Sequence, residues 1–156
     1  IHYRPVKTRC IEEPQKMGII RHIVTDSQRA DIEAKLIGII AKRPEIVFVF
    51  LHGSFVDGPF FRDIDLGLYI KGIGPSDFWD YEAELAQEME AWLNHRFLIE
   101  PKVINNAPLS FCYHVVRGKP IFVRNIQFLE EYMVQIARNY LEIAPLRRRY
   151  LAEAMA

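Results

Sequence analysis

The feature that most constrains this chain is a pair of apolar runs joined by a short polar loop. The first run ends at Gly53-Ser54, and the second opens at Asp63. A β-branched and aromatic run bounded by glycine predicts a buried strand, which we place at residues 46–52. The second run, 63–70, alternates, so that Asp63, Asp65, Gly67 and Tyr69 share one face of a strand. These two segments are expected to be neighbouring strands of a sheet.

Two carboxylates open the second strand. Asp63 and Asp65 are two positions apart, which places their backbones about 6.6 Å apart on one face. Carboxylate oxygens are ligands that Mg²⁺ prefers, and Gly67 is expected to leave room beside them. The Gly53-Ser54 turn presents backbone N–H groups and a hydroxyl, which suit a phosphate. This layout is typical of phosphoryl or nucleotidyl transfer, in which metal ions bridge substrate phosphates.

Apolar residues at helical spacing predict three helices. The first spans about 28–42, with Asp26 or Ser27 as its cap. The second spans about 77–95, and its apolar side is expected to pack in the core: Phe78, Tyr81, Leu85, Met89, Trp92 and Leu93. The third runs from Asn125 to about Ile143, where Pro145 is expected to break it.

Further strands are predicted between the second and third helices. Residues 97–104 form one, in which Leu98, Glu100 and Lys102 share a face. Pro101 lacks the N–H that an inner strand needs, so this strand is expected to be bulged or at the edge of the sheet. Residues 111–117 and 121–123 are expected to form a hairpin. The predicted fold class is α+β: a small mixed sheet with helices packed on one face.

Length and charge limit the classes of function. The 156 residues suit a single domain, which we divide into an N-terminal arm, 1–25, and a folded domain, 26–156. Lys plus Arg and Asp plus Glu both number 20, so no net charge attracts DNA, and no DNA binding is expected. No apolar run is long enough to span a membrane, and no signal peptide is visible. A cytoplasmic location is expected.

Three segments together resemble a known family. They are Gly53-Ser54, the sequence Asp-Ile-Asp-Leu at 63–66, and the sequence Ile-Glu-Pro-Lys-Val-Ile-Asn-Asn-Ala-Pro at 99–108. This combination resembles the DNA polymerase β-like nucleotidyltransferase superfamily. It is most similar to the minimal nucleotidyltransferases that are paired with HEPN-domain toxins. The resemblance covers about residues 28–150 and implies the polymerase β palm-like fold.

The resemblance implies a set of functional residues and partners. Glu100 matches the family's third carboxylate, so Asp63, Asp65 and Glu100 are expected to be catalytic and to hold Mg²⁺ in a two-metal site. Nucleotide binding is expected at three residues: Gly53, Ser54 and Arg62. ATP is the expected substrate, and a tyrosine of a cognate HEPN ribonuclease toxin is the expected acceptor of AMP. The chain would then be an antitoxin that acts by AMPylation.

Departures from the family pattern keep alternatives open. The loop after Gly53-Ser54 is short, with Asp57 where many relatives have a basic residue and Arg62 where a small hydroxyl residue is common. This altered loop favours a second hypothesis, an antitoxin that blocks its toxin by steric binding alone. A small-molecule adenylyltransferase is a third, although such enzymes generally need a second, helical domain. His52 is interpreted as a turn histidine, and the C-terminal helix is a candidate surface for homo- or hetero-oligomer contacts.

Overall fold

A computed structural model describes residues 20–156, in which four strands form one mixed sheet with the order β3–β2–β1–β4. The strands are β1 (Ile46–His52), β2 (Asp63–Ile70), β3 (Leu98–Val103) and β4 (Lys119–Val123). Strand β1 pairs antiparallel with β2 and β4, and β2 pairs in parallel with β3. The predicted mixed sheet and α+β class are confirmed, and the bounds of β1 and β2 agree with the sequence prediction.

Five helices accompany the sheet in the described part of the chain. They are α1 (Asp26–Ala41), α2 (Ser54–Asp57), α3 (Phe78–Trp92), α4 (Leu109–Val116) and α5 (Ile126–Ala154). A short 3₁₀ turn, Pro75–Asp77, leads into α3. The cap of α1 is Thr25 rather than Asp26 or Ser27: its hydroxyl accepts from the Gln28 N–H while the Gln28 side chain accepts from the Thr25 N–H.

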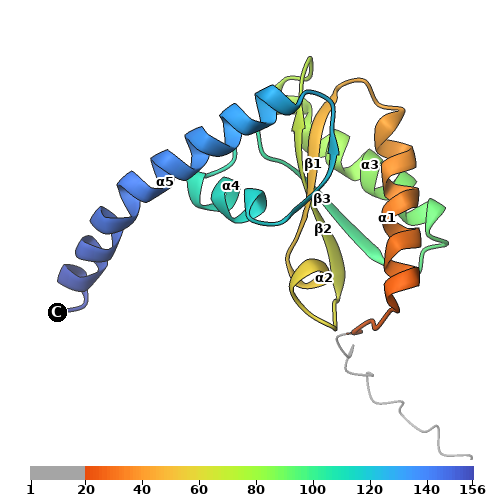
Figure 1. The fold of residues 1–156 in the computed structure, drawn as a ribbon, viewed down its shortest axis with the longest axis horizontal. Helices are drawn as coiled ribbons and strands as arrows, with labels where there is room; N and C mark the ends of the chain where they lie inside the picture. Colours follow the sequence, from red (N-terminus) through yellow and green to blue (C-terminus); the bar gives the residue numbers. More distant parts are fainter. Residues whose placement is uncertain (1–19) are drawn as a thin grey trace, which may run out of the picture.

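Helices cover both faces of the sheet, and the prediction of a single covered face is wrong. Helices α1 and α3 lie on one side of the strands, whereas α4 and the start of α5 lie on the other (Figure 1). The reason lies in β1, whose apolar residues are uninterrupted. Leu51 packs in the cluster under α1 and α3, while Phe48 and Phe50 pack with Val115 of α4 and Leu129 of α5.

The predicted hairpin at 111–123 is wrong, because its first half is helix α4. Pro108 precedes the helix, and the buried residues Cys112, Val115 and Val116 follow the i, i+3, i+4 spacing of one helical face. The second half is strand β4, which pairs with β1 instead. The composition of a short apolar run does not distinguish a strand from a helix. Here the helical spacing of the buried side chains, with a period of 3.6 residues, identifies a helix.

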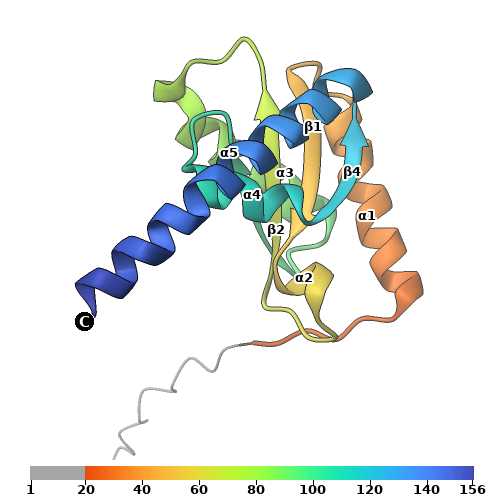
Figure 2. The same cartoon turned by 60° about the vertical axis from the view of Figure 1, so that its left-hand side comes forward.

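Helix α5 continues past Pro145, where it was expected to break. Apart from Ala144, every residue from Leu141 onward is exposed, so solvent can satisfy the carbonyl that loses its donor. In both views the C-terminal half leaves the sheet and ends away from it (Figures 1 and 2). This half carries exposed apolar side chains: Leu141, Ile143, Leu146, Tyr150 and Leu151.

The edge position of β3 is confirmed, since β2 is its only neighbour in the sheet. Its burial alternates, with Leu98, Glu100 and Lys102 exposed. In the predicted arm, residues 1–19 lie outside the described residues. At the described end of the arm, the backbone of His22 pairs with that of Phe61, which lies just before β2. No helix among residues 20–156 is long and apolar enough to cross a membrane.

Candidate active site

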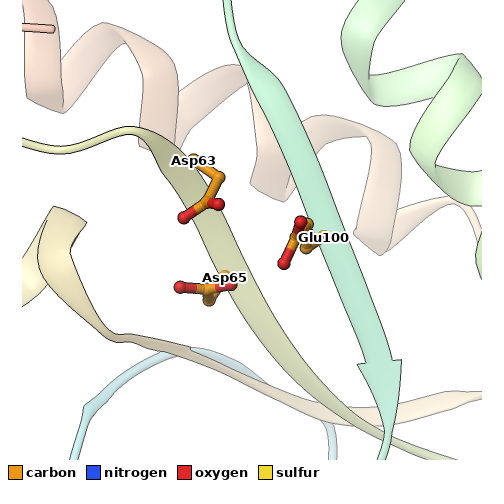
Figure 3. Close-up of side chains that lie close together, drawn as sticks. All are labelled: Asp63, Asp65 and Glu100. Atoms are coloured by element: carbon orange, nitrogen blue, oxygen red, sulfur yellow. The ribbon is translucent and has the colours of Figure 1, made fainter. Parts of the chain in front are cut away.

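The three predicted acids come together on one face of the sheet. Parallel pairing of β2 with β3 sets Asp65 beside Glu100, and Asp63 lies two residues before Asp65 on the same face. Each carboxylate offers a ligand oxygen within 4.8 Å of those of the other two. The three side chains converge from β2 and β3 (Figure 3). The sequence thus predicts a cluster of acids that the pairing of β2 with β3 brings together.

Electrostatic repulsion is concentrated on Asp65, the central acid. Partial burial, and then the charges of Asp63 and Glu100, raise the pKa of the Asp65 carboxyl to about 6. Arg62 opposes this shift, and its Nε lies 3.3 Å from the Asp63 carboxylate. A divalent cation among the acids would remove the repulsion, and three carboxylates at this separation fit the oxygen ligation that Mg²⁺ prefers.

The Gly53-Ser54 turn lies against the acids because residue 53 has no side chain. Gly53 has φ of +74°, and a Cβ there would overlap the Asp65 carboxylate. Ser54 then begins α2, a single helical turn that the sequence did not predict. Arg29 of α1 holds this turn, since its guanidinium donates to the Phe55 carbonyl and lies 4.5 Å from the centre of the Phe55 ring.

Gly67 has a different role from the one expected. The space beside it is filled by Val115 of α4, which a Cβ at residue 67 would overlap. Gly67 therefore allows α4 to pack closely on β2 rather than leaving room for a cation.

Two hollows flank the acids. The first, which we call the serine hollow, has a volume of about 350 Å³ and is lined by Arg21, Ser54, Phe60, Phe61, Arg62 and Asp63. The second, the aromatic hollow, has a volume of about 440 Å³, and its lining includes Asp65, Glu100, Trp79, Phe111 and His52. Both volumes are in the range of small-molecule sites. The acids thus lie between a hollow with a hydroxyl and two guanidinium groups and a hollow with aromatic walls.

His52 is not the turn histidine that the sequence suggested. It is the last residue of β1, pairs across the ladder with Asp65, and is only 7% exposed. Burial, and then the nearby His114, lower the pKa of His52 to about 4, so the imidazole is neutral at pH 7. Its Nε2 is buried and has no hydrogen-bond partner among residues 20–156. An unsatisfied buried polar atom is costly and suggests that a ligand group completes it.

Comparison with known families decides the classification. A family model described as polymerase beta, nucleotidyltransferase matches residues 34–127, which is more than half of the chain. The match includes the Gly53-Ser54 turn and all three acids. The chain belongs to this nucleotidyltransferase family. A comparison with curated proteins finds no match.

Solved structures with a similar fold include chains of toxin–antitoxin complexes. The nucleotidyltransferase is similar to a chain in the structure of a tri-AMPylated Shewanella oneidensis HEPN toxin in complex with an MNT antitoxin, with a TM-score of 0.63 and 21% identity, covering 82% of this chain and 99% of that one. A chain of a toxin–antitoxin structure with AMP-PNP has a TM-score of 0.63 and 23% identity, covering 80% of this chain and 98% of that one. At such identities the likeness establishes the fold.

Other residues at the nucleotidyltransferase site were not predicted from the sequence. The sequence prediction excludes Trp79 from the apolar side of its helix and puts Phe111 in a strand. Both line the aromatic hollow. Trp92, predicted to pack in the core, is 57% exposed. The sequence signal for Trp79 is that it is an apolar residue away from the core-facing side of its helix.

Proposed function

We propose that this protein is a Mg²⁺-dependent enzyme that transfers AMP from ATP to a hydroxyl group. The observation that carries the proposal is the convergence of Asp63, Asp65 and Glu100 beside a Gly-Ser turn. Carboxylates in this number and spacing suit metal-assisted transfer, in which charge on the phosphates must be neutralised. We assign the activity to residues 26–156 as one domain.

Each acid has a proposed role. Asp63 and Asp65 would share two Mg²⁺ ions, and Glu100 would complete the site on the acceptor side. Bound Mg²⁺ would supply charge neutralisation at the phosphates and lower the pKa of the acceptor hydroxyl. The raised pKa of Asp65 fits this assignment, since the charges that repel it are those that a cation would offset.

ATP is proposed to enter by the serine hollow. The Ser54 hydroxyl and the backbone N–H groups of the turn would donate to phosphate oxygens, and Arg62 lies in the same hollow. Gly53 allows this turn to lie against Asp65. The phosphate chain and the acids would then be adjacent, as the reaction requires.

In the proposed reaction the acceptor oxygen forms a bond to the α-phosphorus of ATP. The bond from that phosphorus to the bridging oxygen of the β-phosphate breaks, and pyrophosphate leaves. The acceptor proton passes to the Glu100 carboxylate and then to water. Asp63 and Asp65 hold the reacting groups in place.

The proposed acceptor is a tyrosine of a cognate HEPN-domain toxin, which makes this protein an antitoxin. The support comes from relatives of the same fold: one structure contains a tri-AMPylated HEPN toxin with an MNT antitoxin, and another contains AMP-PNP. A further similar chain belongs to an MntA–HpeT pair in which two aspartates are changed to glutamate, with a TM-score of 0.64 and 22% identity, covering 80% of this chain and 98% of that one. The exposed apolar side chains on α5 are a candidate contact surface for such a partner or for oligomers.

A second hypothesis is an antitoxin that acts by steric binding without transfer. Asp57 favours it, because this residue ends α2 next to the turn and would repel a triphosphate. The clustered acids favour the enzyme, because a purely steric inhibitor has no need for three carboxylates that repel one another.

The experiment is incubation of the protein with α-labelled ATP, Mg²⁺ and the purified cognate HEPN-domain toxin. Asp63→Asn and Asp65→Asn are expected to reduce label transfer at least about a hundredfold, because each removes a charge that holds metal. Asp31→Asn, which changes an exposed acid on α1, is the matched control and should keep the wild-type rate. Wild-type rates in both site variants would refute the metal assignment.

A further inference from the structure

The aromatic hollow has features that the binding of ATP and metal does not use. Trp79 is 81% exposed on the first turn of α3. Phe111 comes from α4, on the other face of the sheet, and packs edge-on to His52 with ring centres 5.7 Å apart. Edge strand β3 lies between these two helices and carries Glu100. Two aromatic side chains from separate helices therefore flank an acid of the site.

We propose that the aromatic hollow is the acceptor subsite and that it selects a phenolic side chain, held by Trp79 and Phe111 with its hydroxyl directed to Asp65 and Glu100. This inference rests on the proposed nucleotidyl transfer and adds the residues that recognise the acceptor. Aromatic rings bind flat rings through offset or edge contacts, whereas they add little for an aliphatic hydroxyl such as serine. Trp79 and Phe111 are thus specificity-determining residues.

The division of the acids between the two hollows indicates which substrate each one takes. Asp63 lines the serine hollow with Ser54 and Arg62, which are donors suited to phosphate oxygens. Asp65 and Glu100 line the aromatic hollow, where Pro101 and Ala83 add apolar surface. Glu82 and Lys102, which form an ion pair with each other, complete its lining. In an in-line displacement the attacking and leaving oxygens lie on opposite sides of the phosphorus. A phosphate chain in the serine hollow therefore leaves the aromatic hollow for the attacking hydroxyl.

His52 provides a second, independent indication of a ligand in this hollow. Its Nε2 is buried without a partner among the described residues, and the side chain lines the same hollow. The neutral imidazole can exchange a hydrogen bond with a hydroxyl. A phenol would thus meet apolar walls around its ring and polar groups at its oxygen. The phenolic oxygen bonds to the α-phosphorus, its proton leaves for Glu100, and pyrophosphate departs as described above.

The test compares two short peptides that differ only in a tyrosine or a serine, each with Mg²⁺ and ATP. In Trp79→Ala the KM for the tyrosine peptide is expected to rise about 3- to 10-fold, with kcat within about twofold and the affinity for AMP-PNP unchanged. Phe111→Leu, which keeps most of the apolar volume, should shift KM in the same direction. Trp92→Ala is the matched control, since it removes an exposed tryptophan from the other end of the same helix. An unchanged KM would overturn the acceptor assignment. An equal loss of AMP-PNP affinity would overturn it too, because the hollow would then bind the adenine base of the nucleotide.

A binding measurement separates this inference from the transfer activity. The chain has two tryptophans, so Trp92→Phe leaves Trp79 as the only one. Its fluorescence should change and saturate with the tyrosine peptide but not with the serine peptide, and the Trp79→Phe protein should show no change. Saturation without any transfer would support the subsite while refuting the proposed function. Transfer to the tyrosine peptide without any Trp79 response would refute the subsite alone.

Discussion

At the scale of single residues, Asp65 is the residue through which the active site affects the folding stability of the protein. The pKa of its carboxyl is raised from 3.8 to about 6 by burial and by the neighbouring acids. A group with a raised folded-state pKa contributes stability below the unfolded pKa and loses it as pH rises through the folded value. The metal-free protein should therefore lose stability between about pH 4 and pH 6 through this group.

Asp65→Asn should consequently raise the melting temperature in EDTA at pH 7.5, and the difference from wild type should shrink toward pH 4. Addition of Mg²⁺ should raise the midpoint of the wild type more than that of the variant. Thermal scans across pH, with the exposed Glu130→Gln of α5 as a control, measure both effects. A variant that melts below wild type in EDTA at pH 7.5 would mean that Asp65 has a structural role.

At the scale of elements, the packing of α4 on β2 depends on Gly67. A Cβ at this position would overlap Val115, so Gly67→Ala is expected to cost about 1–3 kcal/mol of unfolding free energy. Gly38→Ala on α1 is the matched control: its Cβ would have no atom within 4 Å, and it should stabilise the helix by about 0.5–1 kcal/mol. Denaturant unfolding gives both values. Equal effects of the two changes would contradict the close packing of α4.

The same elements show which parts of the fold could be predicted from sequence. Strands β1 and β2 were predictable because a glycine-bounded apolar run and a period of two are local signals. Helix α4 was missed because its eight residues are almost all apolar, and only the spacing of Cys112, Val115 and Val116 distinguishes it from a strand. Pro145 does not break α5, since a proline is tolerated where the helix around it is exposed.

At the scale of the whole molecule, the site forms where five separate elements meet: β1, β2, α3, β3 and α4. Asp63 and Asp65 could be paired from sequence alone, because they are two residues apart on one strand. The position of Glu100 follows from the parallel β2–β3 register, and the family resemblance, not periodicity, indicated it. Trp79 and Phe111 join the site only through the packing of α3 and α4 on the sheet, and His52 joins it through the pairing of β1 with β2. No local sequence pattern contains these long-range contacts.

The central claim is that three converging acids perform AMP transfer, and Glu100 tests it most directly. Intact mass of the purified HEPN-domain partner should increase by AMP units after incubation with wild-type protein, ATP and Mg²⁺, and the toxicity of the partner should fall. Glu100→Gln should bind Mg²⁺·ATP within a few-fold of wild type but transfer AMP at least about a hundredfold more slowly, the scale expected for loss of a positioned base. If Glu100→Gln, Asp63→Asn and Asp65→Asn all neutralise the partner as well as wild type with no change in its mass, the protein is a steric inhibitor and the catalytic account is wrong.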